Sequence, residues 1–182
     1  AGHVPGALNR PLALNLHVIR EALQQTLHEL DPGGQAQASR DMVLVGHSMG
    51  GVLSRLLVSS SGNRLWAATP AVSGRAGAAR DVRQRLAPYL TFEPLAQVST
   101  AIFIAAPHRG TPFAGNRLVR RVANLITLPL AMLEQIGELG GLFPGDAAQV
   151  GPRRIPNSID NLRDTDPFVQ AAADLPLAPR VR

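Results

Sequence analysis

One serine in this sequence stands where its hydroxyl could act as a nucleophile. Residues 42–45 are apolar, residues 46–51 read Gly-His-Ser-Met-Gly-Gly, and apolar residues at helical spacing follow. This is the pattern G-x-S-x-G between a strand and a helix, and Ser48 is its serine. A strand that enters a helix through so short a turn holds the turn residue in a strained backbone conformation with its side chain exposed. The pattern therefore predicts that Ser48 Oγ is exposed at the carboxyl end of the sheet, where it would meet a substrate as a nucleophile.

The neighbours of Ser48 fit the same chemistry. Gly46 and Gly50 have no Cβ, so we expect them to let the strand and the helix approach closely, and Gly51 to extend that approach by one position. The helix that begins near Met49 directs its first N–H groups toward the serine, so the backbone N–H of Met49 is the predicted oxyanion donor. The alternative is a glycine-rich turn with a serine of no chemical role, and the strand before it and the helix after it favour the nucleophile.

Two segments together resemble the bacterial lipases and esterases of the α/β-hydrolase superfamily. They are residues 46–51 and residues 102–111, which read Ile-Phe-Ile-Ala-Ala-Pro-His-Arg-Gly-Thr and are similar to the Thr-Pro-His-Arg-Gly-Ser stretch of those enzymes. Weaker similarity covers most of the chain, including residues 158–162. The resemblance implies a partial α/β-hydrolase fold, with a mostly parallel sheet flanked by helices, and ester hydrolysis through an acyl-enzyme on Ser48. It also implies that the histidine matching His108 belongs to a structural loop.

The base that such a serine needs is harder to find. A serine hydroxyl is a weak nucleophile until a histidine takes its proton and a carboxylate orients that histidine. In α/β hydrolases the chain order is serine, acid, histidine. Here the only histidine after Ser48 is His108, with Asp81 and Glu93 as the carboxylates between them. His47 and His108 are candidates for the wall of a substrate pocket, and His108 as the base is the less favoured alternative.

The remaining carboxylates do not supply a clear triad acid either. Asp160, Asp164 and Asp166 fit turn and cap roles, and Asp166-Pro167 is a typical helix start. The family resemblance places the acid, the catalytic histidine and the second oxyanion donor in parts of the domain that residues 1–182 do not contain. We therefore expect a single, truncated α/β-hydrolase domain that is inactive by itself and leaves sheet edges unpaired.

Composition narrows the other classes of function. The chain has 182 residues, 45% of them hydrophobic, which is enough for one domain with a core. It has no cysteine, and its five histidines show no paired spacing, so no metal site is expected. Residues 46–51 lack the lysine of a phosphate-binding loop, and no G-x-G-x-x-G follows a strand, so no nucleotide or other cofactor is expected.

Charge gives a weaker indication of partners. The net charge is +5, and all eighteen basic residues are arginine. Aromatic residues make up only 4% of the chain, so no stacking platform for nucleic-acid bases is expected. Solvated helix faces are the favoured interpretation of the arginines, and contact with an anionic lipid surface stays open.

Periodicity predicts the elements that hold the serine in place. Helices are expected over residues 12–30, from about 49 to 59 and over 79–90, and strands over 42–45 and 101–105. Residues 101–105 are apolar throughout, as in a strand covered on both faces. Residues 115–137 are amphipathic and contain Pro129, so the segment 115–150 is either a sheet-covering helix or, as favoured here, a cap over the site. Trp66 is expected to pack in the core rather than line a pocket.

Three functions remain in order of preference. The first is hydrolysis of small-molecule or lipid carboxylic esters on Ser48. The second, on the same nucleophile, is acyl transfer or thioester or amide cleavage. The third is a non-catalytic α/β module that keeps the glycines of the turn for packing and uses the fold for binding.

Overall fold

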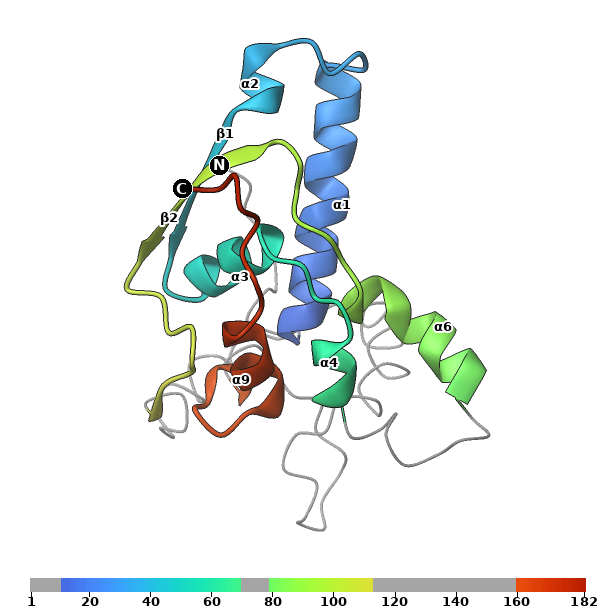
Figure 1. Cartoon of the computed structure of the whole chain (residues 1–182), viewed down its shortest axis with the longest axis vertical. Helices are drawn as coiled ribbons and strands as arrows, with labels where there is room; N and C mark the ends of the chain where they lie inside the picture. Colours follow the sequence, from blue (N-terminus) through green and yellow to red (C-terminus); the bar gives the residue numbers. More distant parts are fainter. Residues whose placement is uncertain (1–10, 70–78, 113–159) are drawn as a thin grey trace, which may run out of the picture.

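The computed structural model describes residues 11–69, 79–112 and 160–182, in which helices precede, separate and follow two strands (Figure 1). In chain order the elements are α1 (Leu12–Leu30), α2 (Gln37–Arg40), β1 (Met42–His47), α3 (Met49–Leu57), α4 (Arg64–Ala67), α6 (Ala79–Leu90), β2 (Val98–Ile104), the 3-10 helix η3 (Asp160–Leu162) and α9 (Pro167–Ala173). The segment 115–150, for which a cap was expected, lies outside the described residues.

β1 and β2 form a two-stranded parallel sheet in the described part of the chain, with Val43 opposite Thr100 and His47 opposite Ile104. Parallel neighbours require a crossover connection. The chain leaves β1 through α3 and comes back to β2 after α4 and α6, and α3 packs against both strands (Figure 1). Parallel strands joined through helices agree with the α/β class expected from the sequence.

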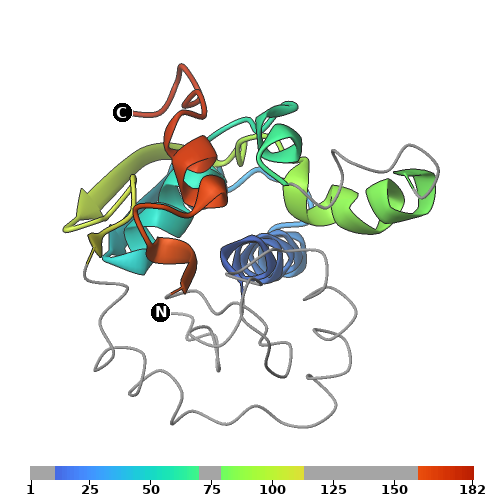
Figure 2. The same cartoon turned by 90° about the horizontal axis from the view of Figure 1, so that it is seen from below.

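The core lies on the side of the sheet that α3 covers. α1 packs against both α3 and α6, and in Figure 2 α1 lies between the sheet and α6. Burying one large aliphatic side chain contributes about 1.5–3 kcal/mol relative to leaving it exposed. The large apolar side chains that are nearly fully buried in this core are Leu12, Leu16, Leu56, Val58, Leu65, Leu86, Leu90, Val98, Val169 and Leu175.

The helix over residues 12–30 has the bounds that its leucine spacing predicts, but only its first half is buried. Leu12 and Leu16 are fully enclosed, whereas Leu30 is 81% exposed. Asp31 ends the helix, and its carboxylate accepts hydrogen bonds from the N–H groups of Gln35 and Ala36. The apolar stripe therefore holds α1 to the core near its start and extends past the core at its end.

The expectation that residues 101–105 form a strand covered on both faces is wrong for the residues described, and β1 is exposed on one face as well. Val43 and Val45 of β1 are 56% and 63% exposed, and Ile102 and Ile104 of β2 are 46% and 48% exposed. Side chains alternate between the two faces of a strand, and α3 covers only one of these faces. Both strands also differ in length from the prediction, since β1 continues through His47 and β2 begins at Val98.

Two short helices were missed. α2 occupies part of what the sequence indicated as a polar linker, and α4 follows the serine-rich segment after α3. Trp66 of α4 is 8% exposed and donates from Nε1 to Thr91 Oγ1 at 2.8 Å, so the prediction that it packs in the core is confirmed. No helix in the described ranges has the length and apolarity to cross a bilayer.

The end of the chain returns to β2 (Figure 1). The Arg182 N–H donates to Ser99 C=O and the Ala101 N–H donates to Arg182 C=O, both at 3.0 Å. Closer to α9, the Ser60 N–H donates to Pro176 C=O at 3.2 Å. These backbone bonds fasten residues 176–182 to the segment that follows α3 and to the sheet.

Candidate active site

Ser48 occupies the turn between β1 and α3 in a strained conformation. Its φ is 54° and its ψ is −125°, and its side chain is exposed. A non-glycine residue in such a region costs about 1–3 kcal/mol and persists only where its surroundings hold it. The Ser48 N–H donates to Ile104 C=O at 2.9 Å, and its C=O accepts from the Gly51 N–H at 2.9 Å. The serine is therefore fixed by its own helix on one side and by the end of β2 on the other.

The close approach of strand and helix depends on Gly46 and Gly51 rather than on Gly46 and Gly50. A Cβ on Gly46 would lie 2.5 Å from Gly50 O and 2.6 Å from Ser54 Oγ. A Cβ on Gly51 would overlap with the Cβ of Ala106. A Cβ on Gly50 would meet nothing within 4 Å, so the packing role expected for Gly50 is wrong. Gly50 lies on the open side of the first turn of α3, and Gly51 on the packed side.

The Met49 N–H lies where a developing negative charge would be stabilised. Met49 is the first residue of α3, directly after Ser48. Its N–H donates to no backbone acceptor in the part of the chain that the structure describes. An unpaired N–H at the start of a helix carries part of the positive end of the helix dipole. The group can therefore donate to an oxyanion formed at the serine.

The segment after β2 lies beside the serine turn. Ala105, the first residue past β2, has φ 47°, and it and Ser48 are the two non-glycine residues with positive φ in the described ranges. Further along, Gly110 has φ 78°, and a Cβ there would lie 2.5 Å from Arg163 O. The Thr111 N–H donates to Leu162 C=O at 2.8 Å. The segment thus leaves the sheet at a strained residue and is fastened to the residues before α9.

His108 belongs to this segment and packs against the sheet. Its ring meets the ring of Phe103 edge to face, with 4.9 Å between the centroids. Its Nδ1 is buried with no hydrogen-bond partner among the described residues. Burial and, to a lesser extent, the positive charge of Arg55 lower the pKa of His108. His47 is the last residue of β1 and is exposed next to the serine.

The described residues do not assemble a complete triad. Neither His47 nor His108 is hydrogen-bonded to Ser48 in the described part of the chain. Glu93 accepts a hydrogen bond from Ser60 Oγ at 2.9 Å, and Asp81 lies in the first turn of α6. Neither carboxylate is hydrogen-bonded to His47 or His108 in the described part of the chain.

Asp166 is the helix cap that its sequence predicted. Its side chain accepts from the Val169 N–H at 3.0 Å, and Pro167 opens α9. Its carboxylate also accepts from Asn161 Nδ2 at 3.0 Å, while Asn161 Oδ1 accepts from the Leu12 N–H at 3.1 Å. This chain of bonds joins α9 to the start of α1.

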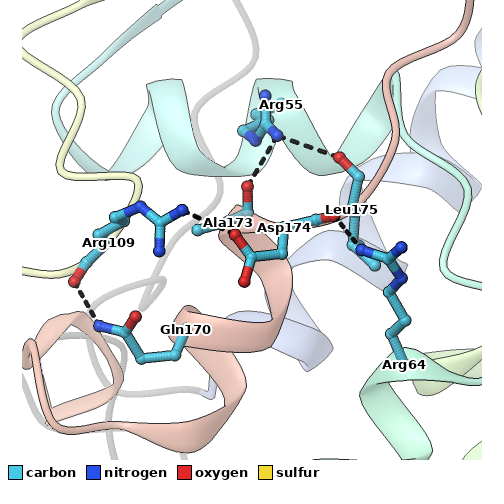
Figure 3. A network of polar contacts seen from close by, with 7 residues as sticks. All are labelled: Arg55, Arg64, Arg109, Gln170, Ala173, Asp174 and Leu175. Atoms are coloured by element: carbon cyan, nitrogen blue, oxygen red, sulfur yellow. Dashed lines mark hydrogen bonds and ion pairs between the residues drawn. The ribbon is translucent and has the colours of Figure 1, made fainter.

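The far end of α3 is held by an arginine that the sequence analysis did not single out. Arg55 donates from Nη2 to Ala173 C=O at 2.8 Å and to Leu175 C=O at 3.0 Å (Figure 3). Ala173 is the last residue of α9 and Leu175 lies just beyond it, at the end of the helix dipole where a positive charge is favourable. Partial burial lowers the pKa of Arg55. Arg55 therefore joins the helix that follows the serine to α9.

Four further residues extend this network (Figure 3). Arg109 pairs with Asp174 at 2.8 Å, and both side chains are largely exposed. Arg64 donates to Asp174 C=O, and Gln170 donates to Arg109 C=O at 2.8 Å. Arg109, the residue after His108, thus joins this segment to Gln170 of α9 and to Asp174 at its end.

Metal sites and known relatives give no further assignment. Within the described ranges no group of three or more histidine, aspartate or glutamate side chains could hold a metal ion. In comparisons with known proteins, no family model, no curated protein and no solved structure matches this chain.

Proposed function

We propose that this protein is a serine hydrolase of the α/β-hydrolase type that cleaves carboxylic esters through an acyl-enzyme on Ser48. The observation that carries the proposal is the conformation of Ser48, which is exposed with φ 54° at a junction of strand and helix. The strained backbone at this residue costs stability, and a serine with no chemical role gives no reason for that cost to persist. The motif in the sequence and the strained turn support the same residue.

The proposed reaction uses three parts of the site. Ser48 Oγ attacks the ester carbonyl, a base takes its proton, and the alkoxide leaves with a proton. The Met49 N–H donates to the oxyanion of the tetrahedral intermediate, and removal of one such donor typically costs about 100–1,000-fold in rate. Water then attacks the acyl-enzyme and restores the serine. We propose that the base and the carboxylate lie outside residues 11–69, 79–112 and 160–182.

The substrate class is proposed from the same features. An apolar ester is favoured over a charged one because the sheet near the serine carries exposed valine and isoleucine side chains. Contact with an anionic lipid surface stays part of the proposal through the exposed Arg80 of α6. Acyl transfer or thioester cleavage would use the same nucleophile and differ in the acceptor.

The test compares two serine variants of the full-length protein. Ser48→Ala should abolish turnover of p-nitrophenyl esters and labelling by a fluorophosphonate probe. Ser60→Ala is the matched control, since the Ser60 hydroxyl bonds only to Glu93 in the described residues. Full turnover in Ser48→Ala, or a parent that neither turns over esters nor takes the probe, would refute the proposal. The second result would favour a non-catalytic module.

A further inference from the structure

Two strained residues lie side by side at the carboxyl ends of the two strands. Ser48 follows β1 with φ 54°, and Ala105 follows β2 with φ 47°. The strands are neighbours in the sheet, and the Ser48 N–H donates to Ile104 C=O, one residue before Ala105. Glycine adopts this backbone region without a steric cost, whereas alanine does not. The turn after β2 therefore keeps a conformation that only its surroundings can maintain.

The residue after Ala105 supplies the reason for that conformation. The Ala106 methyl lies so close to Gly51 that a Cβ on Gly51 would overlap with it. Gly51 is in the first turn of α3, two residues after Met49, and its N–H donates to Ser48 C=O. A displacement of Gly51 therefore moves both the Met49 N–H and the backbone of Ser48.

We propose that Ala105 and Ala106 are positioning residues for the nucleophile. The positive φ at Ala105 directs the chain so that the Ala106 methyl packs against Gly51. This contact sets the position of the first turn of α3. The role rests on the proposed function, because it concerns the group that attacks the ester. It acts through Gly51, and neither alanine needs to touch the substrate.

The chain offers a direct probe of this position. It has no cysteine, so Ser48→Cys introduces a single thiol at the turn. A free thiol has a pKa of about 8.5, and the start of a helix lowers it by stabilising the thiolate. The rate of alkylation by iodoacetamide as a function of pH therefore reports how well the first turn of α3 is placed, and it requires no catalytic base.

A size exchange across the contact gives the test, with all variants made in the Ser48→Cys protein. Gly51→Ala should raise the pKa of the thiol and slow alkylation at pH 7 by about 3–10-fold, which is the loss of thiolate for a rise of about half to one pH unit. Ala106→Gly removes the pressing methyl, and it should raise the thiol pKa by a smaller amount. The double variant Gly51→Ala with Ala106→Gly removes the overlap between the two methyls and leaves the added Cβ 3.0 Å from Gly46 O. Its alkylation rate should therefore recover most, but not all, of the loss seen in Gly51→Ala.

Controls separate positioning from general loss of structure. Gly33→Ala is a matched exchange in a loop, where the added Cβ meets only Gln35 Cγ at 3.5 Å, and it should leave the profile unchanged. Far-UV circular dichroism checks that each variant is folded. If Gly51→Ala fails to fold, recovery of both folding and the thiol profile by the double variant supports the proposal.

Two results would overturn the proposal. One is a folded Gly51→Ala, or a folded Ala106→Gly, with the same thiol profile as the parent. The other is a double variant that behaves no better than Gly51→Ala. Because iodoacetamide needs no triad, a protein that passes this test and fails to take the fluorophosphonate probe would contradict the proposed function alone.

Discussion

Substitution by alanine should change the free energy of unfolding in opposite directions at Gly46 and Gly50, the two glycines on either side of Ser48. A Cβ at position 46 would lie 2.5 Å from Gly50 O, 2.6 Å from Gly51 Cα and 2.6 Å from Ser54 Oγ. A carbon needs about 3.4 Å from such neighbours, so β1 and α3 would have to separate by up to about 0.9 Å. Two of the three neighbours are backbone atoms and cannot rotate away.

The expected free energies follow from these contacts. Overpacking a core typically costs about 1–3 kcal/mol, and the backbone neighbours place Gly46→Ala at about 3 kcal/mol of lost stability. In Gly50→Ala the added Cβ meets nothing within 4 Å, and the residue lies inside α3. Alanine stabilises a helix by about 0.5–1 kcal/mol more than glycine does, so this variant should gain stability. The two variants should therefore differ by about 4 kcal/mol in their free energies of unfolding.

Urea unfolding measures this difference. Trp66 is the only tryptophan and is 8% exposed, so its fluorescence reports loss of the core. With a denaturant slope of about 1–3 kcal/mol/M, the midpoint of Gly46→Ala should fall about 1–3 M below the parent and that of Gly50→Ala should rise slightly. A Gly46→Ala midpoint equal to or above that of Gly50→Ala would show that strand and helix are not in close contact here.

Three further predictions concern side chains in and around this region. Arg55→Met should lose about 2–3 kcal/mol of stability because two carbonyls of the α9 end lose a partly buried cationic donor. Arg109→Met should lose less than about 1 kcal/mol, since its ion pair is 68% and 55% exposed, and equal losses in urea unfolding would contradict the assignment. His108 has a lowered pKa in the folded protein, so between that pKa and its ordinary value of 6.5 the unfolded chain binds more protons. The stability contributed by neutral His108 should therefore rise with pH in that range and be complete above it. His108→Gln should flatten the pH dependence of the urea midpoint in the range just below pH 6.5.

The elements that the sequence predicted well are those set by local pattern. The leucine spacing of residues 12–30 and the apolar positions of residues 79–90 gave both helices with their observed bounds. Asp166-Pro167 gave the start of α9 and the role of its carboxylate. Periodicity and caps act over one or two turns, so a single sequence contains the information that they need.

What the sequence did not predict depends on contacts between distant segments. Arg55 is one arginine of eighteen, and its role comes from carbonyls at positions 173 and 175, more than a hundred residues away. Ala105 has no local signal for a left-handed conformation, because alanine normally avoids it. The exposed face of β2 was not predicted, because an apolar run is compatible with burial on both faces but does not require it.

The backbone at the serine supplies an argument that does not depend on the motif. Ser48 and Ala105 both have positive φ and lie side by side at the ends of the two strands. Together they cost about 2–6 kcal/mol, which is a large share of the 5–15 kcal/mol by which a typical domain is stable. A glycine at position 105 would remove part of this cost without changing the course of the chain. At position 48 a glycine would also relieve the strain, but it would remove the hydroxyl that the proposed reaction needs. The bonds to Ile104 and Gly51 then keep the strained serine in place. Strain and motif thus support the same residue for separate physical reasons, and for this reason Ser48 carries the proposed function.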